Sequence, residues 1–200
     1  MTQQEGQAVL GQQVDRERLE SAGLNILKAF GRTTTEEGLE RTPERFANFF
    51  LEDVVANGVE DPKEMLRSAV FKEDYKGMIV ENGLSFYSLC EHHLVPFFGT
   101  ATIGYIPNGK ILGLSKLPRV LRAFALGPNV QERITIKVAS AIEEVLEPLG
   151  IGVILRATHL CMSARGVRAE TAVTTTSVIK GVFKSGGFAR DEFLRLSKLS

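Results

Sequence analysis

Hydrophobic positions recur at helical spacing through the N-terminal part of the chain. Over residues 14–30 they repeat every three to four positions, which predicts an amphipathic helix. Proline marks two further helix starts. In "RTPERFANFFLEDVV", Thr42 is a candidate cap and Pro43 takes the first helical position, and in "EDPKEMLRSAVF" Asp61 and Pro62 repeat this arrangement. The chain up to residue 75 is therefore predicted to be largely helical.

The pattern then changes to short β-rich segments separated by Gly, Pro and Asn. Three such segments are "GMIVENGLSFYSLC", "LVPFFGTATIGYI" and "GKILGLS", and the "PNG" at 107–109 predicts a hairpin turn. Two helices follow, "SKLPRVLRAFAL" and "VQERITIKVASAIEEVLEPLG", the second ending at Gly150. "IGVILRATHLCM" and "AETAVTTTSVIKGVF" are predicted strands, and "RDEFLRLSK" is a short closing helix.

Helical and strand segments are thus segregated along the chain, which is typical of the α+β class with an antiparallel sheet. We expect three parts: a flexible Gln/Gly-rich N-terminus over 1–12, a helical region over 13–75, and a mixed domain over 76–200.

Composition limits the kinds of partner. The chain is 44% hydrophobic and 24% charged, as in ordinary soluble proteins, and its 24 basic residues balance its 24 acidic ones. A zero net charge argues against general capture of nucleic acid or of an anionic membrane. No apolar run reaches the length of a membrane-spanning helix, and the polar N-terminus lacks the core of a secretory signal. We expect a cytoplasmic protein whose two cysteines are free thiols or metal ligands.

All the cysteines and histidines lie in two short clusters. "SLCEHHLVPFFGT" holds Cys90, His92 and His93, and "THLCMSARG" holds His159 and Cys161. Cys90-x-x-His93 has a spacing common in zinc sites, and His159 and Cys161 would share one face of a strand. Buried thiols and core histidines are the alternative, but the confinement of all five residues favours a metal. Mixed sulfur and nitrogen ligands suit zinc, with iron as the rival, and the spacing leaves open which histidine coordinates.

Several long motifs carry a family resemblance. In order, "GLERTPERFANFF", "SLCEHHLVPFFGTATIGYIPNGKILGLSKLPRV", "NVQERITIKVASAI", "THLCMSARGVR" and "AVTTTSVIKGVFK" closely resemble GTP cyclohydrolase I, over about residues 38–197. The resemblance implies conversion of GTP and water to 7,8-dihydroneopterin triphosphate and formate, the first step of pterin and tetrahydrofolate biosynthesis.

For the metal, the resemblance implies zinc held by Cys90, His93 and Cys161. Three protein ligands leave one coordination position for water, as catalytic sites require. His92 and His159 are then unligated beside the zinc, and the matching family positions donate and accept protons. A pKa near neutrality suits imidazole to that role, although His92 could instead orient a ligand.

For the substrate, the resemblance implies that Glu132 and Gln131 recognise guanine. A carboxylate can accept bonds from N1–H and the 2-amino group together. From the residues alone, a capping pair in the first turn of a helix is the alternative. Three cations match the family's triphosphate-binding positions, and one serine matches a residue in the later ribose rearrangement: Lys116, Arg119, Arg165 and Ser115.

The resemblance also implies the tunnelling fold, an antiparallel sheet with helices on one side that closes into a barrel by oligomerisation. The mixed region over 76–200 would be the catalytic domain. Five chains would form a ring and two rings a homodecamer, with active sites at subunit interfaces.

Two departures from the family pattern stand out. Leu126 and Gly127 occupy places where the family usually carries a basic residue, and Arg156 replaces a commonly acidic one. Two rival hypotheses accompany the hydrolase. A non-catalytic purine- or pterin-binding member of the fold would have lost a ligand, His159 or Glu132, and a purely structural zinc module would not need unligated histidines.

Overall fold

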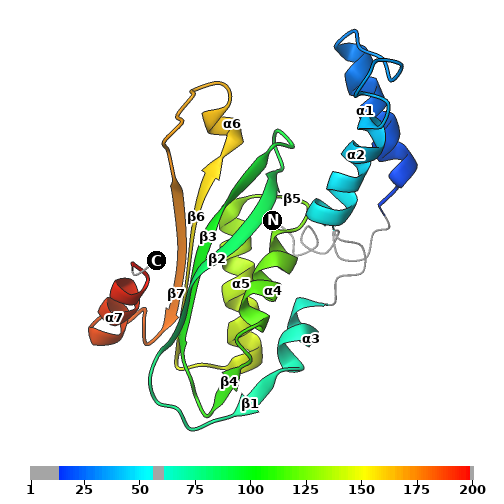
Figure 1. Ribbon diagram of the computed structural model, residues 1–200. Helices are drawn as coiled ribbons and strands as arrows, with labels where there is room; N and C mark the ends of the chain where they lie inside the picture. The colour runs from blue at the N-terminus through cyan, green and yellow to red at the C-terminus, as the bar shows by residue number, and fades with distance from the viewer. Residues whose placement is uncertain (1–13, 56–60, 199–200) are drawn as a thin grey trace, which may run out of the picture. The chain divides into compact units, whose positions relative to one another are not determined.

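The computed structural model describes residues 14–55 and 61–198. They belong to two compact units, Met1–Val59 and Glu60–Ser200. The first contains α1 (Arg16–Ala29), α2 (Thr42–Asn48) and the π-helix η1 (Phe49–Val55) (Figure 1). The division by compactness thus falls earlier than the change of sequence pattern at residue 75. The predicted flexible segment over 1–12 lies outside the described residues.

The N-terminal unit is built on a close helix pair. The Asp15 carboxylate caps α1 by accepting a hydrogen bond of 3.0 Å from a backbone N–H. On α1, Gly23 faces Phe46 of α2, where an added Cβ would lie 3.1 Å from the aromatic side chain. The prediction that Thr42 caps α2 is wrong. Thr42 is the first helical residue, and the capping position belongs to Arg41, which makes no side-chain capping bond.

The second unit is organised around a five-stranded sheet with the order β5-β2-β3-β6-β7. The four long strands pair antiparallel: β2 (Ile79–Cys90), β3 (Pro96–Ile106), β6 (Gly150–His159) and β7 (Thr174–Gly181). The two-residue β5 (Pro128–Asn129) adds a parallel edge to β2. A separate ribbon pairs β1 (Val70–Lys72) with β4 (Lys110–Leu112). The predicted α+β class with an antiparallel sheet is confirmed.

Helices cover both faces of this sheet. On one face, α4 (Lys116–Ala125) and α5 (Gln131–Leu146) pack on alternate strand residues, which form the main core (Figure 1). On the other face, α7 (Phe188–Leu196) buries Phe193 over Gly104 and Gly152. The expectation of helices on one side therefore holds for the two long helices and is wrong for α7.

Replacing Gly152 by alanine is expected to destabilise the protein by about 1–3 kcal/mol, the usual cost of overpacking. An added Cβ would lie 2.4 Å from a ring carbon of Phe193, so α7 would have to shift. Urea unfolding measures the change. Gly113→Ala is the matched control, because its nearest neighbour is 3.4 Å away. Equal unfolding midpoints for the two variants would contradict this packing account.

Two local predictions about the β-region are wrong. The "PNG" turn does place Gly109 at a φ of 74°, but the strand that follows does not fold back on β3. Both edges of β3 are already occupied at that end, since Tyr105 pairs with Ile79 of β2 and with Ile151 of β6. The chain therefore pairs β4 with β1, and Val70–Lys72 is a strand rather than part of a helical region.

The ends of α5 and β6 also differ from prediction. Helix α5 ends at Leu146, not Gly150, because Glu147 adopts a left-handed φ of 50° and a proline follows it. Strand β6 ends at His159, and α6 (Leu160–Ser163) follows. The partner strand β3 begins at Pro96, which has no N–H to extend the ladder. His159 and Cys161 therefore do not share a strand.

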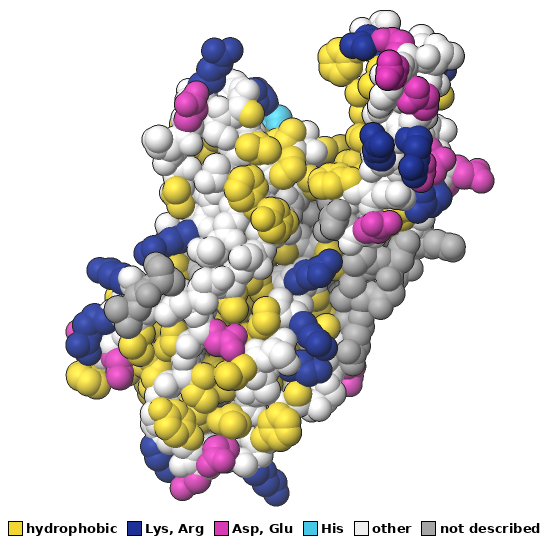
Figure 2. Space-filling model, in the orientation of Figure 1, with side chains coloured by type: hydrophobic (Ala, Val, Ile, Leu, Met, Phe, Trp, Pro, Cys, Tyr) yellow, Lys and Arg dark blue, Asp and Glu magenta, His cyan; other side chains and the backbone are white. Residues whose placement is uncertain are grey.

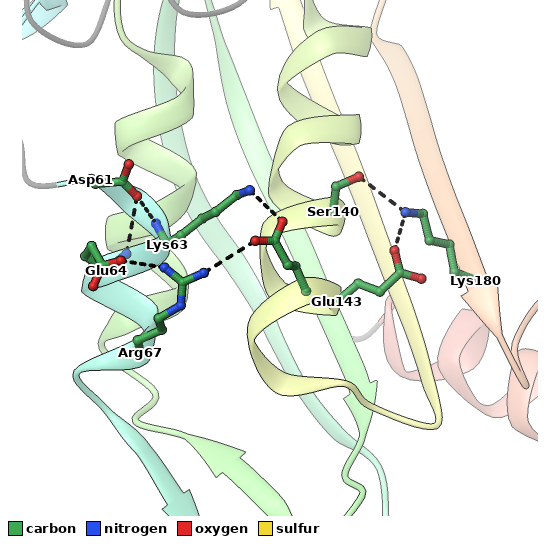
Figure 3. Close-up of polar contacts among 8 residues, drawn as sticks. Asp61, Lys63, Glu64, Arg67, Ser140, Glu143 and Lys180 are labelled. Carbon is green, nitrogen blue, oxygen red and sulfur yellow. Dashed lines mark hydrogen bonds and ion pairs between the residues drawn. The ribbon is translucent and has the colours of Figure 1, made fainter.

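Ion pairs join neighbouring elements near the C-terminal end of α5 (Figure 3). Glu144 of α5 contacts Lys63 at 2.5 Å and Arg67 at 3.4 Å, both on α3 (Pro62–Arg67). On the other side, Lys180 of β7 lies 2.6 Å from Glu143. As predicted, Asp61 caps α3 and Pro62 begins it, and the Asp61 carboxylate accepts two backbone hydrogen bonds. These half-exposed pairs link α3 and β7 to α5.

Candidate metal centre

A tight turn after β2 holds the first cluster. Cys90, the last residue of β2, is 7% exposed, and its carbonyl accepts hydrogen bonds from the N–H groups of His93 and Leu94. Leu94 adopts a left-handed φ of 53°, which reverses the chain into β3. This folding brings Nδ1 of His93 to 3.7 Å from Sγ of Cys90. The local sequence alone thus places two ligand atoms side by side.

The second cluster supplies a third ligand atom from α6. The ligand atoms of Cys90, His93 and Cys161 all lie within 4.8 Å of one another, and both cysteines are free thiols. Around tetrahedral zinc the sulfur and nitrogen ligands stand about 3.6 Å apart, so the three residues fit such an ion with little movement. His92 Nδ1 is also 3.8 Å from Cys90 Sγ, but His92 is not part of the group of three.

The surroundings of the Cys161 thiol favour its protonated form when no metal is bound. Burial, together with the neighbouring Cys90, raises the pKa of Cys161, and the Arg165 guanidinium opposes this. The thiol must lose its proton when a metal binds, so binding releases protons and is pH-dependent.

An ion pair that the sequence analysis missed connects the metal turn to α5. Glu91 lies 2.7 Å from Arg133 on the first turn of that helix, and this guanidinium lowers the pKa of the Glu91 carboxyl. The Glu91 N–H also donates to the Asn129 carbonyl. The two residues are 42 positions apart in sequence and meet only in the folded chain, so no local pattern could reveal the pair.

His159 stands beside the cluster in a defined orientation. Its ring stacks on Phe97 with centroids 4.6 Å apart and planes at 4°. Its Nε2 lies 2.8 Å from Oε1 of Gln131. Burial lowers the pKa of His159, while the nearby Glu132 carboxylate opposes this. Burial thus favours the neutral imidazole, and the stacking on Phe97 and the contact with Gln131 fix its orientation.

The predicted guanine-recognition pair opens α5, but its two members point differently. Glu132 is exposed, whereas Gln131 is 1% exposed and its amide bonds protein atoms. The capping position of α5 is Val130, without a side-chain capping bond. Gln131 therefore takes part in an internal network rather than in a capping pair.

The structure does not bring every predicted site residue to the metal within one chain. Ser115, Lys116 and Arg119 begin α4, and Lys116 Nζ lies 3.2 Å from Ser68 Oγ. The metal cluster lies near the other end of that helix, because β5 follows α4 directly and pairs with Cys90. Ten helical residues rise about 15 Å. The predicted phosphate-binding start of α4 is thus separated from the metal ligands.

The residues that depart from the family pattern have structural explanations. Leu126 ends α4 and is 7% exposed, so an apolar side chain suits its burial. Gly127 adopts a φ of 73°, which favours glycine. Arg156 pairs with Thr100 and is exposed, on the opposite sheet face from His159. The structure records no bond between any of these three residues and the candidate metal ligands.

Apolar side chains remain at the surface of the second unit beside charged ones (Figure 2). Tyr87 and Phe98, neighbours on β2 and β3, stack with ring centroids 5.7 Å apart while 68% and 37% exposed. They lie on the sheet face away from α4 and α5.

The comparisons with known proteins decide the family. The family model for GTP cyclohydrolase I matches residues 19–198. The chain belongs to the GTP cyclohydrolase I family. The GTP cyclohydrolase 1 of Halalkalibacterium halodurans is 47% identical over 92% of this chain and 98% of that protein. Those of Chlorobaculum tepidum and Bacillus subtilis are 46% and 45% identical, over 94% and 91% of this chain and 81% and 95% of theirs. The predicted membership, and with it the identification as an enzyme of this family, is confirmed.

Structural comparison adds little. The crystal structure of the archaeosine synthase QueF-Like in the apo form matches 55% of this chain at 10% identity with a TM-score of 0.46, a likeness too weak to bear on the GTP cyclohydrolase I fold. Within residues 14–55 and 61–198, no helix has the length and apolarity needed to cross a membrane.

Proposed function

We propose that this chain is a zinc-dependent GTP cyclohydrolase that converts GTP and water to 7,8-dihydroneopterin triphosphate and formate, the first step of pterin and tetrahydrofolate biosynthesis. One observation carries the proposal. In a chain of the GTP cyclohydrolase I family, the ligand atoms of Cys90, His93 and Cys161 lie within 4.8 Å of one another. Free thiols as ligands fit a cytoplasmic enzyme.

Zinc is the metal that this donor set suits best. Two thiolates and one imidazole are typical zinc ligands, and three protein ligands leave a fourth position open for water. When bound, zinc lowers the pKa of water and supplies the nucleophile for hydrolysis of the guanine imidazole ring at C8. Cys90, His93 and Cys161 would hold it.

The unligated histidines move protons in this proposal. His92 follows the first ligand by two residues, and His159 is held on Phe97 next to the cluster. As the ring opens and formate leaves, nitrogen atoms of the former imidazole gain protons, and neutral imidazoles can deliver them. Ser115 would act in the later rearrangement of the ribose.

Glu132 would bind the guanine edge. Its carboxylate is exposed at the start of α5 and close enough to His159 to oppose the lowering of that imidazole's pKa by burial. Two carboxylate oxygens can accept from N1–H and the 2-amino group of guanine, a pattern that adenine does not offer.

Replacing Glu132 by glutamine is expected to lower kcat/KM for GTP by about 10- to 150-fold, because hydrogen bonds to a charged group contribute about 1.5–3 kcal/mol. The loss should appear mainly in KM, with zinc content unchanged. Steady-state kinetics with GTP measures it. Glu147→Gln, at the far end of α5, is the matched control. An unchanged KM in the Glu132 variant would contradict the guanine contact.

The triphosphate would be bound by Lys116, Arg119 and Arg165. The first two lie at the start of α4, away from the metal ligands of the same chain. One GTP molecule could contact both sets if the start of α4 came from a neighbouring chain. This separation, and the exposed pair Tyr87 and Phe98, support an assembly in which sites are shared between chains. We propose the homodecamer of two five-membered rings.

The experiment that tests the proposal is product identification. Purified protein loaded with zinc should convert GTP to equal amounts of formate and a triphosphate with the absorbance of a dihydropterin. Zinc-loaded oligomer that binds GTP and forms neither product would overturn it, and the non-catalytic purine- or pterin-binding hypothesis would then lead.

A further inference from the structure

Gln131 is a buried polar side chain placed between the sheet and the candidate site. It is 1% exposed at the start of α5. Its Nε2 lies 3.1 Å from each of three oxygens, which are the carbonyls of Leu155 and Thr174 and the hydroxyl of Thr176. Its Oε1 lies 2.8 Å from Nε2 of His159. The amide therefore has protein partners at both ends.

The chemistry of these partners fixes which end of the amide is which. Backbone carbonyl oxygens accept hydrogen bonds and cannot donate them, so the two hydrogens of the Gln131 amide nitrogen must face Leu155 and Thr174. A flipped amide would place Oε1 against both carbonyls and leave buried polar atoms unpaired, at a large cost.

Two threonines, Thr135 on α5 and Thr176 on β7, support the same orientation. The Thr135 hydroxyl donates to the Gln131 carbonyl at 2.8 Å, so its single hydrogen is used. The Thr176 hydroxyl, 2.7 Å from Thr135, must then donate to it, which leaves lone pairs on Thr176 facing the Gln131 amide nitrogen. Three acceptors therefore face the two hydrogens of the Gln131 amide nitrogen, and none of the three can donate to an oxygen in that place.

The orientation of the Gln131 amide determines the tautomer of His159. Because Oε1 of Gln131 can only accept, Nε2 of His159 must carry a hydrogen. In a neutral ring the lone pair is then on Nδ1. Parallel stacking on Phe97 fixes the ring plane independently, with planes at 4°. Tautomer and orientation are thus both set by neighbouring residues.

We propose that Gln131 is a positioning residue that holds His159 in the Nε2–H tautomer, so that Nδ1 is the ring nitrogen with the free lone pair. This inference rests on the proposed proton-transfer role of His159. Gln131 itself does not contact guanine.

Gln131→Met tests this role, because methionine has a similar length and no hydrogen-bonding amide. We expect kcat to fall about 10- to 100-fold, as on loss of a hydrogen bond that orients a functional imidazole. KM for GTP should change less than about 3-fold, since no substrate contact is removed. Zinc content should stay at the wild-type value. A raised KM with kcat retained would overturn the proposal and support a guanine contact.

A second measurement needs no folded Gln131 variant. The chain contains three histidines, so the zinc-loaded wild-type protein labelled with ¹⁵N-histidine yields three imidazole spin systems. The system that disappears in His159→Asn belongs to His159. The proposal predicts a hydrogen on Nε2 and a lone pair on Nδ1 of that ring, and the opposite tautomer would overturn it. Failure of the proton-transfer role itself would instead appear as full activity in His159→Asn.

Discussion

Replacing Cys161 by alanine is expected to remove metal binding and GTP turnover together. Cys90 and His93 would remain in their turn, but two ligands cannot hold zinc as three do. Loss of residues that merely orient metal ligands already costs about 10- to 100-fold, so loss of a ligand should lower kcat/KM by more than about 100-fold. Zinc content per chain and formate release from GTP measure the two effects.

Met162→Leu is the matched control, because Met162 is the next residue of α6 and is 38% exposed. It should keep both zinc and turnover. A Cys161→Ala protein with one zinc per chain and wild-type turnover would contradict the assignment of this thiol as a ligand.

Replacing His159 by asparagine is expected to lower kcat by about 10²- to 10⁴-fold, the usual contribution of a general acid–base group. Asparagine keeps a polar side chain near Gln131 but cannot carry a proton at neutral pH. Zinc binding should persist, because His159 is not among the three grouped ligands. Single-turnover kinetics with GTP, alongside metal analysis, separates the chemical step from binding.

Thr158→Ser serves as the control on the same strand, since Thr158 points to the opposite face of β6. Its kcat should match that of the wild type. If His159→Asn keeps its zinc and reaches wild-type kcat, His159 is not a proton-transfer residue.

Much of the fold could be predicted from local pattern. Helical spacing and proline marked α1 and α3, and the β-rich segments after residue 76 correspond to β2, β3 and β4. The metal pair Cys90 and His93 was also predictable, because one tight turn brings the two side chains together. These features depend on residues a few positions apart.

What the sequence alone did not predict depends on long-range partners. The strand after the "PNG" turn, β4, pairs with β1 rather than with β3, because both edges of β3 are occupied. Cys161 lies in α6 because the partner strand begins at Pro96. The inward direction of Gln131 depends on the carbonyls of Leu155 and Thr174, residues 24 and 43 positions away.

The central claim is that the group formed by Cys90, His93 and Cys161 holds the zinc that makes this chain a GTP cyclohydrolase. The most direct measurement is a zinc titration of chelator-treated protein, with formate release from GTP recorded at each step. Formate release is expected to rise from near zero in proportion to bound zinc and to reach its maximum at one ion per chain. Full formate release without bound zinc, or none at one zinc per chain with GTP bound, would contradict it.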